Sequence, residues 1–184
     1  MKNKLNVKKI TIGALLLSVA LLLPQAFHFT MIPQVGQVFL PMHIPIFLAG
    51  FILGPVFGLI LGIISPIISF LFTNMPLIQR LPYMIIELSS YGFLAGLLYR
   101  TFAFEKRTFG IYKTLILSMI FGRLTFFIAL AIAQFLNILA PGFSLYLVID
   151  AIIMGTYGII IQLIIIPIII YSLKRSGYID KLHR

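Results

Sequence analysis

The sequence predicts an all-α integral membrane protein, and two features of its composition lead to that prediction. Of the 184 residues, 61% are hydrophobic and only 10% are charged, and the mean hydropathy is +1.12. Soluble domains contain roughly 45–50% apolar and about 25% charged residues. The core of a soluble protein of 184 residues could not hide so much apolar surface from water, so the surrounding solvent must be lipid. The composition therefore argues against a soluble enzyme, a nucleic-acid-binding domain and a secreted scaffold.

We expect six transmembrane helices in a single membrane domain that covers residues 1–184. The apolar stretches predict spans at about 10–29, 43–53, 55–73, 82–99, 111–136 and 145–173. The basic start and the apolar run after it also resemble a secretory signal peptide. Cleavage is disfavoured because five further spans follow with no exported domain, and because Pro24 to Phe27 make a poor small-residue cleavage site.

The second stretch is short, only ~16 Å long at 1.5 Å per residue, and Gly54-Pro55 follows it directly. Because proline does not continue a helix cleanly, this is either a tight turn between antiparallel helices or a kink in one helix over Ile44–Thr73. Charge placement favours the turn. With six spans and a cytoplasmic N-terminus, only Arg80 lies in an outer loop and Arg123 lies in the membrane, while the remaining basic residues lie inside: Lys2, Lys4, Lys8, Lys9, Arg100, Lys106, Arg107, Lys113, Lys174, Arg175, Lys181 and Arg184.

This asymmetry follows the positive-inside rule and predicts that both termini are cytoplasmic. Merging the second and third stretches into one helix would move most of the basic residues outside. The net charge of +10 is therefore interpreted as a topological signal. The basic residues could also bind anionic lipid head groups or an acidic partner protein.

Small residues recur every fourth position in the second and third stretches, at Gly50, Gly54, Gly58 and Gly62, and again in the fourth at Gly92 and Gly96. Such stripes let two helix backbones approach closely, so we expect internal packing. Ala14 and Ser18 form a similar pair on the first span, just after a basic segment. Pattern alone leaves two roles open for this pair, docking of a partner protein and packing within the bundle.

Three ionisable residues lie within the predicted spans: Glu87, Arg123 and Asp150. Charges are costly in hydrocarbon, so each should face the bundle interior or a cavity. Glu87 and Arg123 each lie twelve residues, ~18 Å, from the inner end of their spans, which are joined by a cytoplasmic loop. Equal depth in an antiparallel hairpin permits a salt bridge between them. The alternative is a polar wall in which Arg123 binds a ligand carboxylate or hydroxyl, and one arrangement can serve both purposes.

Asp150 lies near the outer end of the last predicted span. Tyr146, Met154 and Tyr157 share its helical face at spacings of four and seven, so this face could contact a small polar ligand. Asp150 could equally cap the start of the helix. Tyr91 lies four residues beyond Glu87 in the same manner and is a further candidate.

The first outer loop supplies Gln37 and, at its edge, His43 as candidate ligand contacts, since amides and imidazoles form hydrogen bonds with small molecules. We expect no metal site, because two histidines fifteen residues apart are weak evidence for one. We also expect no catalytic residue, because the sequence lacks a Walker-type loop, an HExxH helix and a Gly-x-Ser-x-Gly elbow. A membrane enzyme would need Glu87 and Asp150 to act together, and nothing in their spacing requires it.

A stand-alone transporter or channel is the other alternative. Secondary transporters commonly contain two related halves around a central site, and no convincing internal repeat is present here. A polar-lined cavity without its own energy source instead indicates a binding subunit that depends on an external energy source.

Several motifs resemble one family, the substrate-binding S components of energy-coupling factor (ECF) vitamin transporters. The stretch 41–58 is similar to a second-span signature of that family, and Glu87-Leu88 with Tyr91-Gly92 resembles its fourth span. Gly122-Arg123 resembles the fifth span. Further similar segments cover nearly the whole chain: Ser65-Pro66, residues 73–76, residues 95–100 and residues 158–167 with Gln162.

The resemblance implies a six-helix subunit in the plasma membrane of a prokaryote that captures a vitamin or related micronutrient from outside, with the pantothenate-type branch most similar. It implies a transmembrane coupling protein and two cytoplasmic ATPases as partners. This chain would then need no cofactor of its own, because the ATPases use the ATP. In the family, small residues four apart on the first span form the docking face, and here Ala14 and Ser18 occupy those positions.

Overall fold

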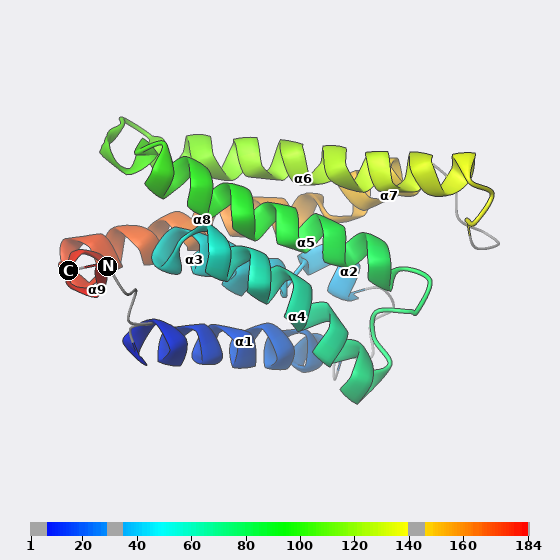
Figure 1. The fold of residues 1–184 in the computed structure, drawn as a ribbon, viewed down its shortest axis with the longest axis horizontal. Helices are drawn as coiled ribbons and strands as arrows, with labels where there is room; N and C mark the ends of the chain where they lie inside the picture. The colour runs from blue at the N-terminus through cyan, green and yellow to red at the C-terminus, as the bar shows by residue number, and fades with distance from the viewer. Residues whose placement is uncertain (1–6, 29–34, 140–145, 184) are drawn as a thin grey trace, which may run out of the picture.

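The computed structural model describes residues 7–28, 35–139 and 146–183, and every regular element in that part of the chain is helical. The elements follow one another along the chain as α1 (Val7–His28), α2 (Val35–Phe39), α3 (His43–Leu53), α4 (Pro55–Thr73), α5 (Leu81–Gly96), η1 (Leu97–Thr101), η2 (Phe104–Lys106), α6 (Gly110–Phe135), α7 (Tyr146–Met154), α8 (Thr156–Arg175) and α9 (Tyr178–His183). Figure 1 shows α1, α6 and α8 running roughly along the long axis of the bundle, with α4 and α5 tilted between them.

Six helices in the described part of the chain are long and apolar enough to cross a membrane. They cover Val7–Ala26, Gly36–Leu53, Pro55–Thr73, Leu81–Thr101, Gly110–Phe135 and Thr156–Arg175. The predicted fold class, an all-α bundle of six membrane-spanning helices, is therefore confirmed. Large apolar side chains remain exposed along the outside of the bundle, as expected for a surface covered by lipid rather than water.

Gly54 forms a turn between α3 and α4, so the kinked single helix is excluded. Its φ of 102° lies in a region that side chains with a Cβ rarely adopt, and Pro55 then starts α4 at a position where proline is well tolerated. The glycine stripe lies where this hairpin crosses α5. A Cβ on Gly58 would collide with the backbone of Gly92, and a Cβ on Gly96 would collide with that of Pro55. The stripe therefore serves internal packing.

Two spans differ from the sequence-based expectation. The second begins earlier, because the short helix α2 and the turn at Leu40 to Met42 precede α3. The last is not one helix, because it is interrupted at Gly155 between α7 and α8. Glycine is a weak helix former, and here a Cβ at position 155 would press against the Leu40 side chain from the α2–α3 turn. A glycine at this position therefore leaves room for the α2–α3 turn beside the interruption.

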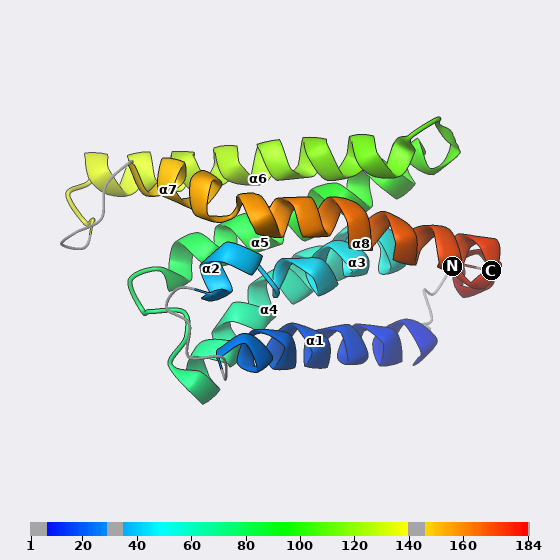
Figure 2. The ribbon, with the colours of Figure 1, turned by 180° about the vertical axis from the view of Figure 1, so that it is seen from behind.

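The two ends of the bundle differ in charge. The start of α1, the η1–η2 connection, the start of α6 and the end of α8 lie at one end, as Figures 1 and 2 both show. We call this the basic end, since those segments contain Lys8, Lys9, Arg100, Lys106, Arg107, Lys113, Lys174 and Arg175. Lys174 ties two of the segments together, because its Nζ donates a hydrogen bond of 2.8 Å to the Glu105 carbonyl. The start of α5 and the α2–α3 turn face the opposite end.

The crossing of α4 and α5 yields a prediction about stability. A methyl group at position 92 would meet the Gly58 backbone, so Gly92→Ala should force the two helices apart. Overpacking of this kind typically costs about 1–3 kcal/mol. We expect a clearly lower thermal unfolding midpoint for Gly92→Ala in detergent. Gly36→Ala is the matched control, because nothing lies within 4 Å of a Cβ there. Equal midpoints for the two variants would contradict the close backbone contact.

Candidate functional site

A cavity of about 410 Å³ lies at the end of the bundle opposite the basic end. Its walls come from α1, α2, the α2–α3 turn, the start of α3, α4, the α4–α5 connection, α5, α6 and α7. Its volume lies within the range of about 300–1,000 Å³ that small-molecule sites occupy in proteins. The surroundings are mostly apolar, with a few polar side chains among prolines, methionines and aromatic rings. This composition is typical of a site for a small organic molecule.

The cavity has a buried floor and an exposed rim. His43, Ser69 and Glu87 line it and are buried, whereas Gln37 and Asp150 line it and are exposed. The floor residues lie at the first residue of α3, near the end of α4 and in the middle of α5. The cavity therefore opens at the end of the bundle away from the basic end.

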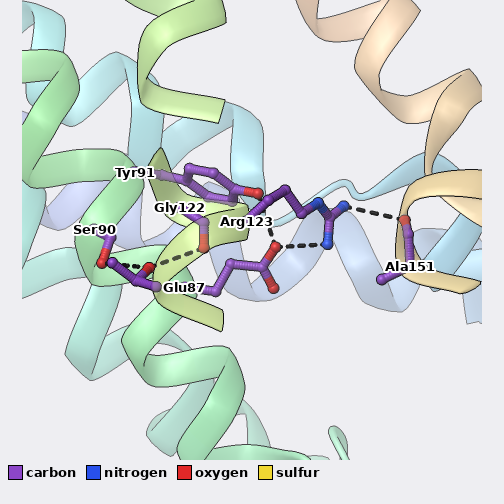
Figure 3. Close-up of polar contacts among 7 residues, drawn as sticks. Glu87, Ser90, Tyr91, Gly122, Arg123 and Ala151 are labelled. Carbon is purple, nitrogen blue, oxygen red and sulfur yellow. Dashed lines mark hydrogen bonds and ion pairs between the residues drawn. The ribbon is translucent and has the colours of Figure 1, made fainter. Parts of the chain in front are cut away.

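An ion pair forms one side of the floor. Arg123 Nη1 lies 2.7 Å from Glu87 Oε1, and the Tyr91 hydroxyl donates a hydrogen bond of 2.8 Å to the same carboxylate oxygen (Figure 3). Arg123 Nη2 donates a third bond, of 3.1 Å, to the Ala151 carbonyl on α7. The salt bridge permitted by the equal depths of Glu87 and Arg123 is thus present. It connects α5, α6 and α7 at one level of the bundle.

Tyr91 forms the layer beneath the cavity rather than part of its wall. Its ring packs against those of His43 and Phe47, with centroid separations of 5.4 and 5.1 Å. Gly122 leaves room for the ring, since a Cβ there would collide with it. This close contact explains why a glycine precedes Arg123, and it fixes the height at which Arg123 enters the cavity. Nearby, Thr125 Oγ1 lies 3.0 Å from Ser90 Oγ and donates to the Gly122 carbonyl at 2.8 Å, which adds a second polar link between α5 and α6.

His43 is a buried polar residue of the floor whose ring nitrogens have no hydrogen-bond partner among the described residues. The residue is only 5% exposed. Buried polar groups in native proteins nearly always have a partner, so an unpaired one requires an explanation. Since His43 lines the cavity, a ligand or water in the cavity would supply that partner.

Most of the candidate ligand contacts from the sequence meet around this cavity. Arg123, Glu87, Asp150, His43 and Gln37 all line it. Tyr91 contacts the cavity only through Glu87 and His43, as described above. Whether any of these residues binds a substrate remains a prediction.

Tyr146 is an exception. It is the first residue of α7, it is 74% exposed, and it is not part of the cavity wall. The expected face shared by Asp150 and Tyr157 is also wrong, because the interruption at Gly155 places these residues on different helices. A periodic pattern cannot reveal such an interruption within one continuous apolar stretch.

Sequence reasoning identified Glu87 but did not assign Arg80 and Met84 to the same face. Arg80, Tyr83, Met84 and Glu87 all line the cavity, at relative positions zero, three, four and seven. That spacing places side chains on one face of a helix and was visible in the sequence. The sequence alone identifies Arg80 only as the basic residue of an outer loop. Met75, Pro76 and Leu77 complete this wall from the α4–α5 connection, which no helical period could have indicated.

Two further expectations concern metal binding and docking. Within residues 7–28, 35–139 and 146–183, no group of three or more His, Asp or Glu side chains lies where it could hold a metal ion. Ala14 and Ser18 are both exposed on α1, where the Ser18 hydroxyl donates a hydrogen bond of 3.0 Å to the Ala14 carbonyl. This bond keeps the serine hydroxyl on its own helix, so the surface at Ala14 and Ser18 is small and smooth.

Comparison with known proteins identifies the family. The model of the family described as ECF transporter, substrate-specific component, matches residues 8–170. No curated protein and no solved structure matches the chain. The match covers most of the 184 residues, including all six apolar helices except the first residue of α1 and the last five residues of α8. The chain therefore belongs to the family of substrate-specific components of ECF transporters.

Proposed function

We propose that this protein is the substrate-capture subunit of an ATP-driven importer in the plasma membrane of a prokaryote. The observation that carries the proposal is the cavity with a polar floor in a chain of the ECF substrate-specific family. In the proposed orientation the basic end lies in the cytoplasm, in accordance with the positive-inside rule. The cavity then opens to the outside, where a scarce nutrient would be captured.

The substrate we favour is a vitamin or related micronutrient, with pantothenate first. A cavity of about 410 Å³ suits a molecule of that size. Pantothenate has a carboxylate, an amide and hydroxyl groups, and the arginines, His43 and Gln37 around the cavity offer complementary hydrogen-bonding groups.

Delivery into the cell would use energy from partner proteins, a transmembrane coupling protein and two cytoplasmic ATPases. We propose that the exposed surface at Ala14 and Ser18 contacts the coupling protein. Small side chains allow close helix approach within a membrane, where packing rather than hydrophobic burial drives association. The neighbouring exposed residues Ile10, Leu15 and Leu22 would add apolar contact area on either side.

Replacement of Arg123 tests the role of the cavity floor. Arg123→Ala leaves Glu87 buried without its partner and removes the hydrogen bond to Ala151, so the floor should lose its shape. We expect the Arg123→Ala variant still to insert into the membrane. After purification it should bind pantothenate at least tenfold more weakly than the wild-type protein, as measured by isothermal titration calorimetry. Glu87→Gln is a milder companion, because its amide oxygen can still accept the hydrogen bond from Tyr91. An unchanged affinity of Arg123→Ala for pantothenate would show that Arg123 is only a structural partner of Glu87.

Larger side chains on α1 test the docking surface. Ala14→Leu and Ser18→Leu should leave vitamin binding intact, because neither residue lines the cavity, and should reduce co-purification with the coupling protein several-fold. Ser172→Leu provides the matched control, as it makes the same change at an exposed position of α8. Assembly that is equally strong in all three variants would contradict a docking role for this face.

Uptake measurements test the energy source. Cells that express the complete importer should accumulate labelled pantothenate, and inactivation of the two ATPases should reduce that accumulation to background. The purified subunit should still bind the vitamin, since capture itself needs no ATP. Uptake that persists without the ATPases would instead indicate a self-contained transporter.

A further inference from the structure

The two arginines of the cavity are in different electrostatic situations. Arg123 is engaged on both terminal nitrogens, by the Glu87 carboxylate at 2.7 Å and the Ala151 carbonyl at 3.1 Å. Arg80 also lines the cavity and is half-buried, yet its guanidinium makes no hydrogen bond or ion pair within the described ranges. The positive charge of Arg123 is therefore balanced by a direct ion pair inside the protein, whereas the Arg80 guanidinium forms no ion pair in the described part of the chain.

Arg80 and Glu87 mark two levels of the cavity along α5. Seven residues separate them, which corresponds to ~10.5 Å along a helix and to nearly the same helical face. Tyr83 and Met84 line the cavity between them. A ligand lying along α5 would thus meet Arg80 near the open rim and the Glu87–Arg123 pair at the floor.

The floor favours an uncharged polar group. The charges of Glu87 and Arg123 cancel each other there, so a further charge would gain no counter-ion in a buried environment. His43 lines the same level with both ring nitrogens unpaired. A neutral imidazole donates through one nitrogen and accepts through the other, so it complements a hydroxyl or amide group.

The rim favours an anion. A guanidinium binds a carboxylate through two parallel hydrogen bonds, and partial burial strengthens the attraction because less water competes. Arg80 also immediately precedes α5, and the positive end of that helix dipole adds to the attraction. Asp150 is the opposing charge on the rim, but its side chain is exposed and is therefore hydrated without a ligand.

We propose that Arg80 is the anion-binding residue of this cavity and that it selects substrates with a carboxylate at one end and an uncharged hydroxyl or amide at the other. The carboxylate lies at the rim beside Arg80, and the uncharged group lies at the floor beside His43. This inference rests on the proposed function and specifies the substrate class of the same site.

Pairs of ligands that differ only in their charge test the proposal. Suitable probes are pantothenate with pantothenol, biotin with biotinamide, and nicotinate with nicotinamide, each titrated into the purified full-length protein by isothermal titration calorimetry. We expect the wild-type protein to bind at least one acid more than tenfold tighter than its neutral counterpart. Arg80→Gln should lose most of that preference by weakening acid binding while leaving neutral binding within about twofold.

Arg175→Gln is the matched control, because it removes an exposed arginine at the basic end. It should retain the wild-type preference. Thermal unfolding of each variant without ligand separates a folding defect from a binding defect, and Arg80→Lys, which keeps the charge, should restore part of the preference if Arg80→Gln unfolds.

The outcomes distinguish this inference from the function on which it rests. Tight binding with an unchanged acid preference in Arg80→Gln overturns the role of Arg80 and leaves the capture function intact. A wild-type protein that prefers the neutral probes, or that binds a cationic vitamin such as thiamine through Asp150, also overturns it. Failure of the wild-type protein to bind any vitamin contradicts the capture function and this inference together.

Discussion

The buried pair of Glu87 and Arg123 is the interaction on which the arrangement of the site depends. Either charge alone would cost several kcal/mol or more in a membrane interior, so each requires the other at the same depth. The 2.7 Å contact satisfies this requirement, and the bonds from Tyr91 to Glu87 and from Arg123 to Ala151 hold the two side chains in place. Because the partners lie on α5, α6 and α7, meeting the electrostatic requirement also fixes how these helices surround the cavity.

That pair can form only because the helix backbones approach closely. Gly58 and Gly92 let α4 and α5 touch where they cross, and Gly122 lets α6 lie against the Tyr91 ring. These small residues thus determine the rotation and depth of α5. This orientation of α5 points Glu87 toward the bundle interior. Helices in a membrane gain little from the hydrophobic effect when they associate, because lipid solvates apolar side chains equally well. Their packing therefore relies on close backbone contacts of this kind. The floor of the cavity is therefore positioned by residues that have no polar chemistry of their own.

The charge distribution distinguishes the two ends of the molecule. At the basic end, Arg100 donates from Nε and Nη2 to the carbonyls of Phe51 and Ile52, so it covers the end of α3. Positive charge is favourable at the C-terminus of a helix, where unpaired carbonyls gather. At the other end the chain leaves room for a cavity and keeps fewer charges. In the proposed orientation, capture of a substrate would thus take place at the end of the bundle away from the cytoplasm.

The sequence alone determined the features that depend on position along one chain. Apolar stretches indicated six spans, Gly54-Pro55 with the basic residues indicated a turn, and equal counting from one loop placed Glu87 and Arg123 at a common depth. Contacts between helices distant in sequence were decided only by the tertiary structure. The last stretch is divided at Gly155, so Asp150 and Tyr157 lie on different helices, and the Leu40 side chain lies where a Cβ at position 155 would press against it. The meeting of Arg80 and His43 at one cavity likewise follows from how α3 and α5 pack, which no periodicity within either helix encodes.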